Sequence, residues 1–314
     1  MTISAAIDLF LADRELRGCT QKTIFGYKMF LDMFASYCGG LGIMDCSLLD
    51  VGVVNGYQLY LLRKKNGNNG VSGLSRSTVR TYVRHVKVFL TYCFESGLII
   101  SNISLLVRLP RPDKRAIEIL SDGAIKIIME NLDDGSAFAL RNRIIILLML
   151  DCGLRMMEVV GLKREDVHVT DSYLMVLGKG NKTRVVPVGN RVRNLLSDYM
   201  SLPMWKDAKH GYFLLHKSGR PITGSVVKSL CFRLKRGTGI KKLHPHLFRH
   251  TFATNYLLGG FGDVYELSRI LGHSEVRTTE RYLHIASYYE VIRRRGRDSY
   301  FDRLESGKGA EKND

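Results

Sequence analysis

Long apolar runs and paired cysteines are both missing from this chain of 314 residues. The longest apolar stretch, IIILLML at 144–150, is far shorter than the roughly 20 residues that cross a bilayer. The six cysteines form no CxxC pair and no dense framework, so we expect buried thiols in a reducing compartment rather than disulfides. The N-terminus lacks a basic segment before an apolar run, which argues against a signal peptide. These absences predict a soluble, cytoplasmic protein.

Acidic residues are also scarce, since 30 Asp and Glu stand against 47 Lys and Arg, a formal net charge of +17. The hydrophobic fraction of 45% is that of a globular protein rather than a disordered one. Net charge by itself keeps proteins soluble, but a pI of 9.7 over a whole folded chain is typical of a protein that binds a polyanion. We therefore predict nucleic acid as the partner, ahead of an anionic membrane surface, and association with the nucleoid.

The hydrophobic pattern divides the chain into a helical first part and a mixed second part. Two prolines and several charges in residues 107–120 indicate an extended linker, and Ser121 is a good helix N-cap after it. We place an N-terminal domain at 1–108, the linker at 109–116, a second domain at 117–295 and a polar tail at 296–314.

The second domain combines helices with a short hairpin. An apolar helix is predicted at about 140–152, and two β-like segments at 172–178 and 183–189 flank the turn KGNK. Helices resume from Asn190. The predicted fold class is therefore mainly α with a small β-sheet: an all-helical N-terminal domain and a mixed α+β second domain.

Residues 75–97 predict a helix with two distinct faces. Apolar side chains from Val79 to Cys93 recur at helical spacing and should face a core. Another face carries four cations and no acid: Arg76, Arg80, Arg84 and Lys87. A solvated face is the simpler explanation, but such faces normally mix charges. We interpret this stripe as a contact to the DNA backbone.

Tyr282, near the end of the second domain, raises the question whether its hydroxyl is structural or reactive. Cutting a DNA strand with such a phenol would require a specific set of partners. The attacked phosphate gains charge on its non-bridging oxygens, which arginine forks and N–H donors stabilise. The leaving 5′ oxygen needs a proton, and the phenol must lose one. Cations and histidines from several segments would have to converge on one phosphate.

Candidates for these roles occur in the second domain, and each also has an ordinary structural explanation. Arg155 follows the apolar helix, where it could simply pair with Glu158 at i+3. Lys179 and Lys182 lie in the hairpin turn, where solvated lysines are common.

The segment HPHLFRHTFATNYLL is richer in such candidates. His246 and Arg249 lie at i, i+3 on a helix predicted to start near Pro245, so both can address one phosphate at a helix N-terminus. His273 follows at a predicted turn, and Tyr282 lies nine residues later on the next helix.

Four motifs together resemble the tyrosine recombinases, the phage-integrase and Xer-like family. They are GLRMMEVVGL, GKGNKTRVVPV, HPHLFRHTFAT and LGHSEVRTTERYLHI, in family order and at family-like separations. The resemblance covers residues 115 to 290, and the N-terminal part fits as a helical, DNA-clamping domain. Any one motif is weak, whereas the four together are highly specific.

The resemblance implies a role for each matching position. Arg155 and Arg249 would hold the scissile phosphate, and His273 would donate a hydrogen bond to it. Lys179 would protonate the 5′ oxygen, with Lys182 as a neighbouring alternative that also contacts DNA. His246 would assist proton transfer at the nucleophile Tyr282, which would form a 3′-phosphotyrosine. Glu158 and His250 would have structural roles, contacting and orienting the catalytic groups.

The same resemblance implies no metal and no other cofactor. The phosphotyrosine conserves the energy of the cut bond, so rejoining would need no ATP. A zinc site at His244, His246 and His250 is disfavoured, because no cysteine or acid lies at a suitable spacing and Arg249 would repel the ion. A DNA-binding protein without catalysis and a type IB topoisomerase are further alternatives.

The biological role has two candidates within the family. One is integration or excision of a mobile genetic element, and the other is Xer-like resolution of chromosome or plasmid dimers. The chain starts directly with the helical domain, which fits both, while the basic residues 63–65 and the loop at 66–73 favour a mobile element slightly. We expect a tetramer on two double-stranded DNA sites, with possible DNA-bending or directionality factors. Tyr300, Phe301 and Leu304 in the tail could dock on a neighbouring subunit or on their own domain.

Overall fold

The computed structural model describes residues 1–64, 73–113, 117–133, 138–178, 180–206 and 211–295. The chain divides into two compact units, Met1–Arg115 and Ala116–Asp314. This division falls inside the segment that the sequence predicts as a linker. Every helix within the described ranges is too short or too polar to cross a bilayer.

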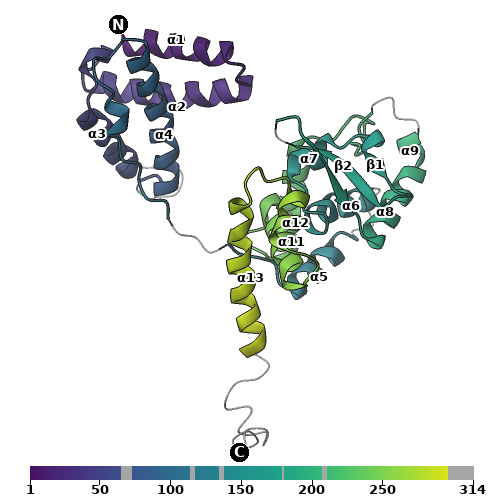
Figure 1. The fold of residues 1–314 in the computed structure, drawn as a ribbon. Coiled ribbons are helices and arrows are strands. Elements are labelled where there is room, and N and C mark those ends of the chain that lie inside the picture. Colours follow the sequence, from purple (N-terminus) through teal and green to yellow (C-terminus); the bar gives the residue numbers. More distant parts are fainter. Residues whose placement is uncertain (65–72, 114–116, 134–137, 179, 207–210, 296–314) are drawn as a thin grey trace, which may run out of the picture. The chain divides into compact units, whose positions relative to one another are not determined.

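The described residues of the N-terminal unit form four α-helices and two short 3-10 turns (Figure 1). Their bounds are α1 (Ile3–Leu16), α2 (Gln21–Gly40), η1 (Cys46–Leu48), α3 (Val51–Arg63), α4 (Arg76–Glu95) and η2 (Ile103–Leu105). Each α-helix begins after a residue whose side-chain oxygen accepts a hydrogen bond from a backbone N–H of the first turn. These N-caps are Thr2, Thr20, Asp50 and Ser75.

The core of this unit is formed by apolar faces of its helices, including the predicted face of α4. Leu31 and Phe34 of α2 are buried, as is the apolar face of α4 from Val79 to Cys93. Phe10 of α1 packs edge-on against the ring of Phe89, with centroids 5.8 Å apart. All six cysteines of the chain are free thiols, five of them buried, as the sequence predicts.

The predicted basic stripe of α4 divides into two pairs. Arg76 and Arg84 are exposed. Arg80 and Lys87 are partly buried and donate to the carbonyls of Pro110 (2.9 Å) and Val107 (3.3 Å). Only half of the stripe is therefore free to contact a partner, because the other two cations are hydrogen-bonded to the chain segment after η2.

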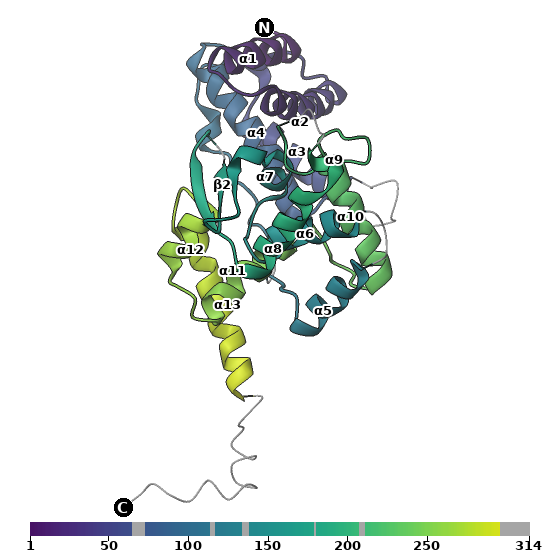
Figure 2. The ribbon, with the colours of Figure 1, turned by 90° about the vertical axis from the view of Figure 1, so that its right-hand side faces the viewer.

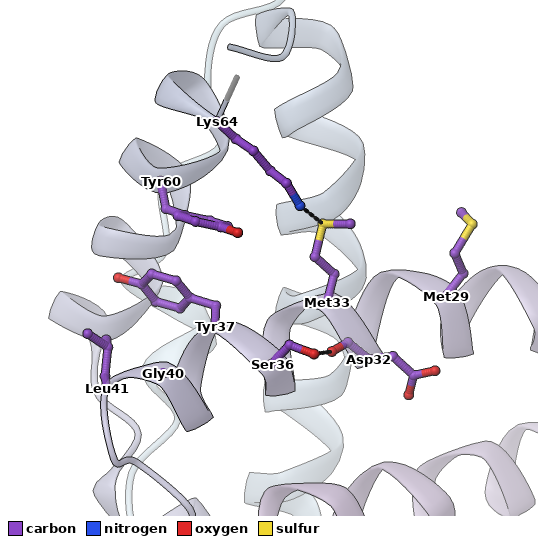
Figure 3. Close-up of a pocket in the computed structure, with 9 residues that line it drawn as sticks. All are labelled: Met29, Asp32, Met33, Ser36, Tyr37, Gly40, Leu41, Tyr60 and Lys64. Carbon is purple, nitrogen blue, oxygen red and sulfur yellow. Dashed lines mark hydrogen bonds between the residues drawn. The ribbon is translucent and has the colours of Figure 1, made fainter. Parts of the chain in front are cut away.

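An open groove of about 700 Å³ lies beside α2 and α3 in the same unit. Figure 3 shows Met29 and Met33 on one side and the rings of Tyr37 and Tyr60 on the other. The ammonium of Lys64 lies 5.6 Å from the centroid of the Tyr60 ring. The unit thus leaves a largely apolar recess accessible to solvent.

The second unit contains nine α-helices, one 3-10 turn and a small sheet among its described residues. Their bounds are α5 (Asp122–Asn131), α6 (Ala139–Leu150), α7 (Met156–Gly161), η3 (Arg164–Asp166), β1 (Val167–His168), β2 (Tyr173–Leu177), β3 (Thr183–Pro187), α8 (Asn190–Ser201), α9 (Pro203–Lys206), α10 (Gly224–Thr238), α11 (Pro245–Leu258), α12 (Val264–Leu271) and α13 (Arg277–Arg295). Ser121 caps α5 as predicted, accepting from the Ala124 N–H at 3.2 Å. The fold class is confirmed: mainly helical, with a small sheet.

The sheet is antiparallel in the order β1-β2-β3. The sequence predicts β2 and β3 and their hairpin. In the structure Leu174 lies opposite Val186. It misses β1, which is only two residues long and so has no detectable alternation.

Helix α6 is the centre of the core of this unit. Its residues Ile144 to Met149 are all buried, which explains why the segment is apolar on every side. Helix α11 packs against α6, and α12 and α13 pack against α11 (Figures 1 and 2). This arrangement brings the starts of α7, α11 and α13 close to the end of α12.

Candidate active site

A tight turn after α6 positions Arg155. Gly153 has φ +67°, and a Cβ at this residue would lie 2.4 Å from the ring of Phe252, so only glycine is accommodated. Arg155 is the N-cap of α7, and its own N–H donates to Oε2 of Glu158 (2.8 Å). Its guanidinium donates to Oε1 of Glu158 (2.8 Å) and to the Gly272 carbonyl (3.2 Å). The predicted i+3 ion pair is present, yet the Arg155 side chain remains 33% exposed.

Arg249 approaches the same place from α11 and is buried, with 4% of its side chain exposed. It donates to the carbonyls of Gly153 (2.5 Å) and Leu271 (2.7 Å) and lies 3.1 Å from Nε2 of His273. Burial, followed by the charge of Arg155, lowers the pKa of Arg249 to about 9. The group is therefore still cationic at neutral pH.

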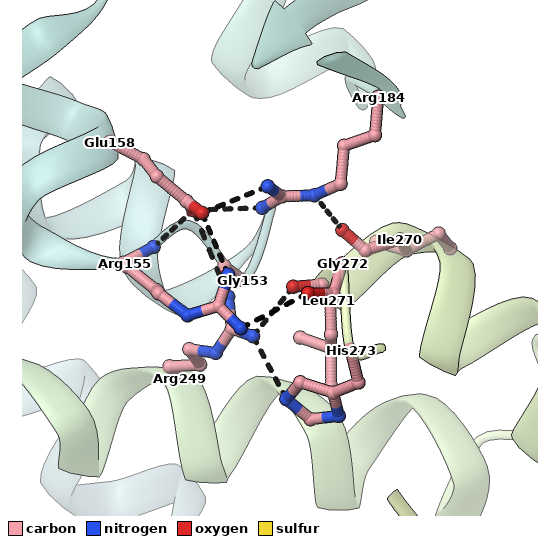
Figure 4. Close-up of polar contacts among 9 residues, drawn as sticks. All are labelled: Gly153, Arg155, Glu158, Arg184, Arg249, Ile270, Leu271, Gly272 and His273. Atoms are coloured by element: carbon pink, nitrogen blue, oxygen red, sulfur yellow. Dashed lines mark hydrogen bonds and ion pairs between the residues drawn. The ribbon is translucent and has the colours of Figure 1, made fainter. Parts of the chain in front are cut away.

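Glu158 is the carboxylate around which the arginines gather (Figure 4). Besides Arg155 it accepts two hydrogen bonds from Arg184 of β3, at 2.9 and 2.8 Å, and it lies 3.9 Å from Nη1 of Arg249. Burial would raise the pKa of Glu158, but the hydrogen bonds from Arg184 and Arg155 outweigh it and lower the pKa. Glu158 is ionised at neutral pH.

Arg184 is a site residue that the sequence analysis did not identify. A signal for it was available: in an alternating strand, Arg184 lies on the same face as the buried Val186. A charged residue on the inward face of a short strand indicates a buried ion pair.

These groups carry a surplus of positive charge. Three guanidinium groups, of Arg155, Arg184 and Arg249, face the one carboxylate of Glu158, leaving two uncompensated positive charges among them. Because burying unpaired charge is unfavourable, such a cluster is a strong binding site for an anion. Two of the three, Arg155 and Arg249, are the arginines that the sequence predicts to hold a phosphate.

His273 lies between this cluster and the start of α13. Its Nε2 lies 3.1 Å from the Arg249 guanidinium, and its Nδ1 lies 2.7 Å from Oγ1 of Thr279. Since arginine can only donate, Nε2 accepts and Nδ1 carries the proton. Burial, then the charges of Arg249 and Arg155, lowers the pKa of His273 to about 4. His273 is therefore neutral at pH 7, and Nε2 can donate to a phosphate only after it releases Arg249 and takes up a proton.

Tyr282 of α13 is fully buried, with 0% exposure. Its hydroxyl lies 2.8 Å from Nδ1 of His250 and accepts from Arg281 at 3.0 Å. The Arg281 guanidinium also covers the phenol ring, 4.9 Å from its centroid. Because Arg281 can only donate, the phenolic hydrogen is best placed on the bond toward His250.

The two histidines of α11 differ in their contacts. Burial, then the charge of Arg281, lowers the pKa of His250 to about 4, so His250 is neutral and can accept the phenolic hydrogen bond. His246 is exposed, and its ring centroid lies 6.3 Å from that of His250. Burial of part of its ring, then the neighbouring His244 and Arg249, lowers the pKa of His246. The residue that contacts the Tyr282 hydroxyl in this structure is His250, rather than the predicted His246.

The remaining predicted residues are less informative. Lys179 lies outside the described residues, and Lys182 is exposed in the hairpin turn. His244 caps α11, with its Nδ1 accepting from the Leu247 N–H at 3.1 Å. In the described part of the chain, no group of three or more His, Cys, Asp or Glu side chains is arranged to hold a metal ion. His244 and His250 thus already have partners in the protein.

Comparison with known proteins identifies similar chains. Residues 118–288 match the model of the phage integrase family. The chain is 32% identical over 217 residues to tyrosine recombinase XerC of Staphylococcus carnosus, which covers 68% of this chain and 73% of the relative. It is 25% identical over 289 residues to tyrosine recombinase XerD of Halalkalibacterium halodurans, covering 90% and 94%. The fold is similar to that of the Tn1549 transposon integrase in complex with a circular intermediate DNA, with a TM-score of 0.72, 18% identity and coverage of 93% and 99%.

Proposed function

This chain belongs to the phage integrase family of tyrosine recombinases, and from that premise we propose that Tyr282 cuts and rejoins DNA through a covalent 3′-phosphotyrosine. The enzyme is a site-specific DNA recombinase. The assignment of its individual catalytic residues is the part that we propose.

The observation that carries this assignment is the surplus of positive charge around Glu158. Arg155 and Arg249 lie 94 positions apart in the sequence, yet both approach one carboxylate, at 2.8 and 3.9 Å. A phosphodiester carries one negative charge, and attack by an oxygen increases it on the non-bridging oxygens. Two uncompensated guanidinium charges in a partly buried site match that increase.

In the proposed reaction the Tyr282 oxygen bonds to phosphorus while the bond from phosphorus to the 5′ oxygen breaks. The 5′ oxygen takes its proton from Lys179. The phenol releases its proton to the adjacent pair of His246 and His250. Attack by a 5′ hydroxyl of another strand then reverses these transfers and frees the tyrosine. No ATP is consumed, because the phosphotyrosine retains the energy of the cut bond.

The burial of Tyr282 requires a change before cleavage. Its hydroxyl is enclosed by His250 and Arg281, so a DNA phosphate can contact it only after the start of α13 or the side chain moves. A phosphate that draws Arg281 away would remove one of these two contacts. We therefore expect DNA binding to expose the nucleophile.

Assembly on DNA is the second part of the proposal. We expect double-stranded DNA as the partner and four protomers on two sites. The tail at 296–314, which we expect to dock on a neighbouring subunit, lies outside the described residues. Removing it should preserve binding to a single site but impair pairing of two sites; unimpaired recombination would refute docking in trans.

Two biological roles are proposed for the recombinase. Integration or excision of a mobile element is the role favoured by the sequence features at 63–73. The relatives named XerC and XerD support the alternative, an Xer-like resolvase of DNA dimers. The position of the cleaved site in the genome distinguishes them, because an element carries the site at its ends.

The experiment that tests the function works with any DNA that contains the target site. The protein is incubated with fragments of its host's genomic DNA, denatured in SDS, and the covalently attached strands are sequenced. We expect one recurrent 3′ end, linked to Tyr282 by peptide mapping, and no adduct from Tyr282→Phe. An adduct formed by Tyr282→Phe, or none from the wild type with DNA that it binds specifically, would overturn the assignment.

A further inference from the structure

Arg184 is the most enclosed arginine of the cluster after Arg249. Its side chain is 11% exposed, and its guanidinium donates to both oxygens of Glu158 at 2.8 and 2.9 Å. Its Nε donates to the Ile270 carbonyl at 2.6 Å. Gly272, with φ +63°, lies against this side chain, since a Cβ there would be 2.9 Å from Cδ of Arg184. Arg184 is packed behind the site and has its donors directed into the protein.

Glu158, the partner of Arg184, is an acid placed where it can weaken the phosphate site. Glu158 lies within 2.8 Å of the Arg155 guanidinium and 3.9 Å from that of Arg249. An ionised carboxylate at these distances competes with a phosphate for both arginines. Arg184 offsets that competition, because a guanidinium fork matches a carboxylate with two parallel hydrogen bonds.

Arg184 also fixes the end of α12. The carbonyl after Ile270, that of Leu271, accepts from Arg249, and the carbonyl of Gly272 accepts from Arg155. Figure 4 shows these three consecutive carbonyls directed toward the three guanidinium groups. The Arg184 side chain therefore connects strand β3 to Glu158 and to the end of α12, and both of these contact the phosphate-binding arginines.

We propose that Arg184 is a positioning residue that supplies the counter-charge of Glu158 and so leaves Arg155 and Arg249 available to the DNA phosphate. The inference rests on the proposed function, since it assumes that these two arginines hold the scissile phosphate. The proposed effect is electrostatic. Loss of Arg184 should slow DNA cleavage because the charge of Glu158 is then left uncompensated.

An electrostatic effect of this kind predicts that a second substitution, at Glu158, restores the cleavage rate. In Arg184→Gln the carboxylate would turn its whole charge toward Arg155 and Arg249. In the double variant Glu158→Gln/Arg184→Gln that charge is absent, while the amide oxygen at position 158 can still accept the Arg155 N–H. If Arg184 only stabilised the fold, the second substitution would remove further hydrogen bonds and lower the cleavage rate further.

The test measures the single-turnover rate of covalent adduct formation on the duplex recovered with the wild-type protein. Arg184→Gln should be slower by about tenfold or more, the equivalent of a small loss of transition-state stabilisation. The double variant should be faster than Arg184→Gln, and Arg184→Lys should be intermediate. Arg193→Gln is the matched control, because it removes the same charge from a partly buried arginine that donates to Ser172 (3.5 Å).

Two results would overturn the proposal: a wild-type rate for Arg184→Gln, or a double variant as slow as the single one. If Arg184→Gln does not fold, a folded double variant with near wild-type rate supports the proposal and an inactive one refutes it. Wild type and Tyr282→Phe are run beside these variants. An adduct with Tyr282→Phe would instead show that the proposed function is wrong.

Discussion

The hydroxyl of Tyr282 lies 2.8 Å from Nδ1 of His250, in a place that solvent does not reach. A buried hydroxyl needs a partner, and His250 and Arg281 are the ones it has. The proposed nucleophile is thus held by hydrogen bonds to two side chains of the same domain. This relationship makes His250 the residue through which the state of Tyr282 can be changed experimentally.

Replacing His250 should loosen Tyr282. In His250→Phe the phenolic hydrogen has no acceptor, which costs about 1–3 kcal/mol for a buried polar group. His250→Asn places an amide near the position of Nδ1 and should lose less. Urea unfolding measures the stability, and nitration by tetranitromethane followed by peptide mapping measures the exposure of Tyr282. Equal stability and equal nitration of the two variants would contradict the role of the hydrogen bond.

Stability should fall on acidification through the histidines of the site. Their folded pKa of about 4, for His250 and for His273, lies below the unfolded value of roughly 6.5. The unfolded chain therefore binds more protons between these values, so the stabilisation is complete above pH 6.5 and is lost as the pH falls toward 4. We expect a loss of about 3 kcal/mol in total for these partly buried groups.

Urea unfolding of wild type and His250→Asn across that pH range checks this expectation. The variant should show a shallower dependence, because one of the two titrating groups is gone. His284→Gln is the control, since His284 is exposed on α13. Parallel curves for wild type and His250→Asn would exclude His250 as a source of the acid sensitivity.

The turn at Gly153 gives a prediction about backbone geometry. Gly153→Ala combines an unfavourable positive φ with a contact of 2.4 Å to the Phe252 ring, so it should destabilise the protein by about 1–3 kcal/mol. It should also displace the Arg155 N–H from Glu158 and reduce adduct formation. Gly123→Ala in α5 is the control, because a Cβ there meets nothing within 4 Å, and it should be neutral or slightly stabilising. Thermal unfolding of the two variants measures the difference; equal stability of Gly153→Ala and Gly123→Ala would contradict the prediction.

The sequence predicts this site better than it predicts its supports. The sequence motifs point to Arg155, Arg249 and His273, which the structure places together, and to Tyr282; their roles in catalysis stay predictions. Arg184 was not identified, because its place on the face of Val186 indicates a buried charge but not which carboxylate it contacts; that depends on how α7 packs against β3. The contact of Tyr282 with His250 rather than His246 has the same origin, since it depends on how α13 packs on α11. The helices and the hairpin followed from local patterns, whereas the two-residue strand β1 exists only through its pairing with β2.

Arginine at position 249 should be required for its shape as well as its charge. Arg249→Lys keeps the cation but cannot reach the Gly153 and Leu271 carbonyls and a phosphate together. We expect adduct formation to fall by about 10²–10³-fold, as for loss of one fixed donor to a developing oxyanion. DNA binding to the unnicked site, measured by fluorescence anisotropy, should change much less. A variant that cleaves at the wild-type rate would exclude the proposed role of Arg249 in holding the scissile phosphate.

The basic stripe of α4 offers a comparison within one helix. Arg76 and Arg84 are exposed, so Arg76→Ala/Arg84→Ala should weaken DNA binding and reduce the salt dependence of the affinity by about two counterions without changing stability. Arg80 and Lys87 instead hold the carbonyls of Pro110 and Val107, so Arg80→Ala/Lys87→Ala should lower the stability of the N-terminal unit by about 1–2 kcal/mol. Both double variants lose the same net charge from the same helix face, which makes each the control for the other. Anisotropy titrations at several salt concentrations and urea unfolding of each variant separate the two effects. If the two double variants lose DNA affinity with equal salt slopes and unfold alike, the division of the stripe into a DNA-binding pair and a bracing pair is wrong.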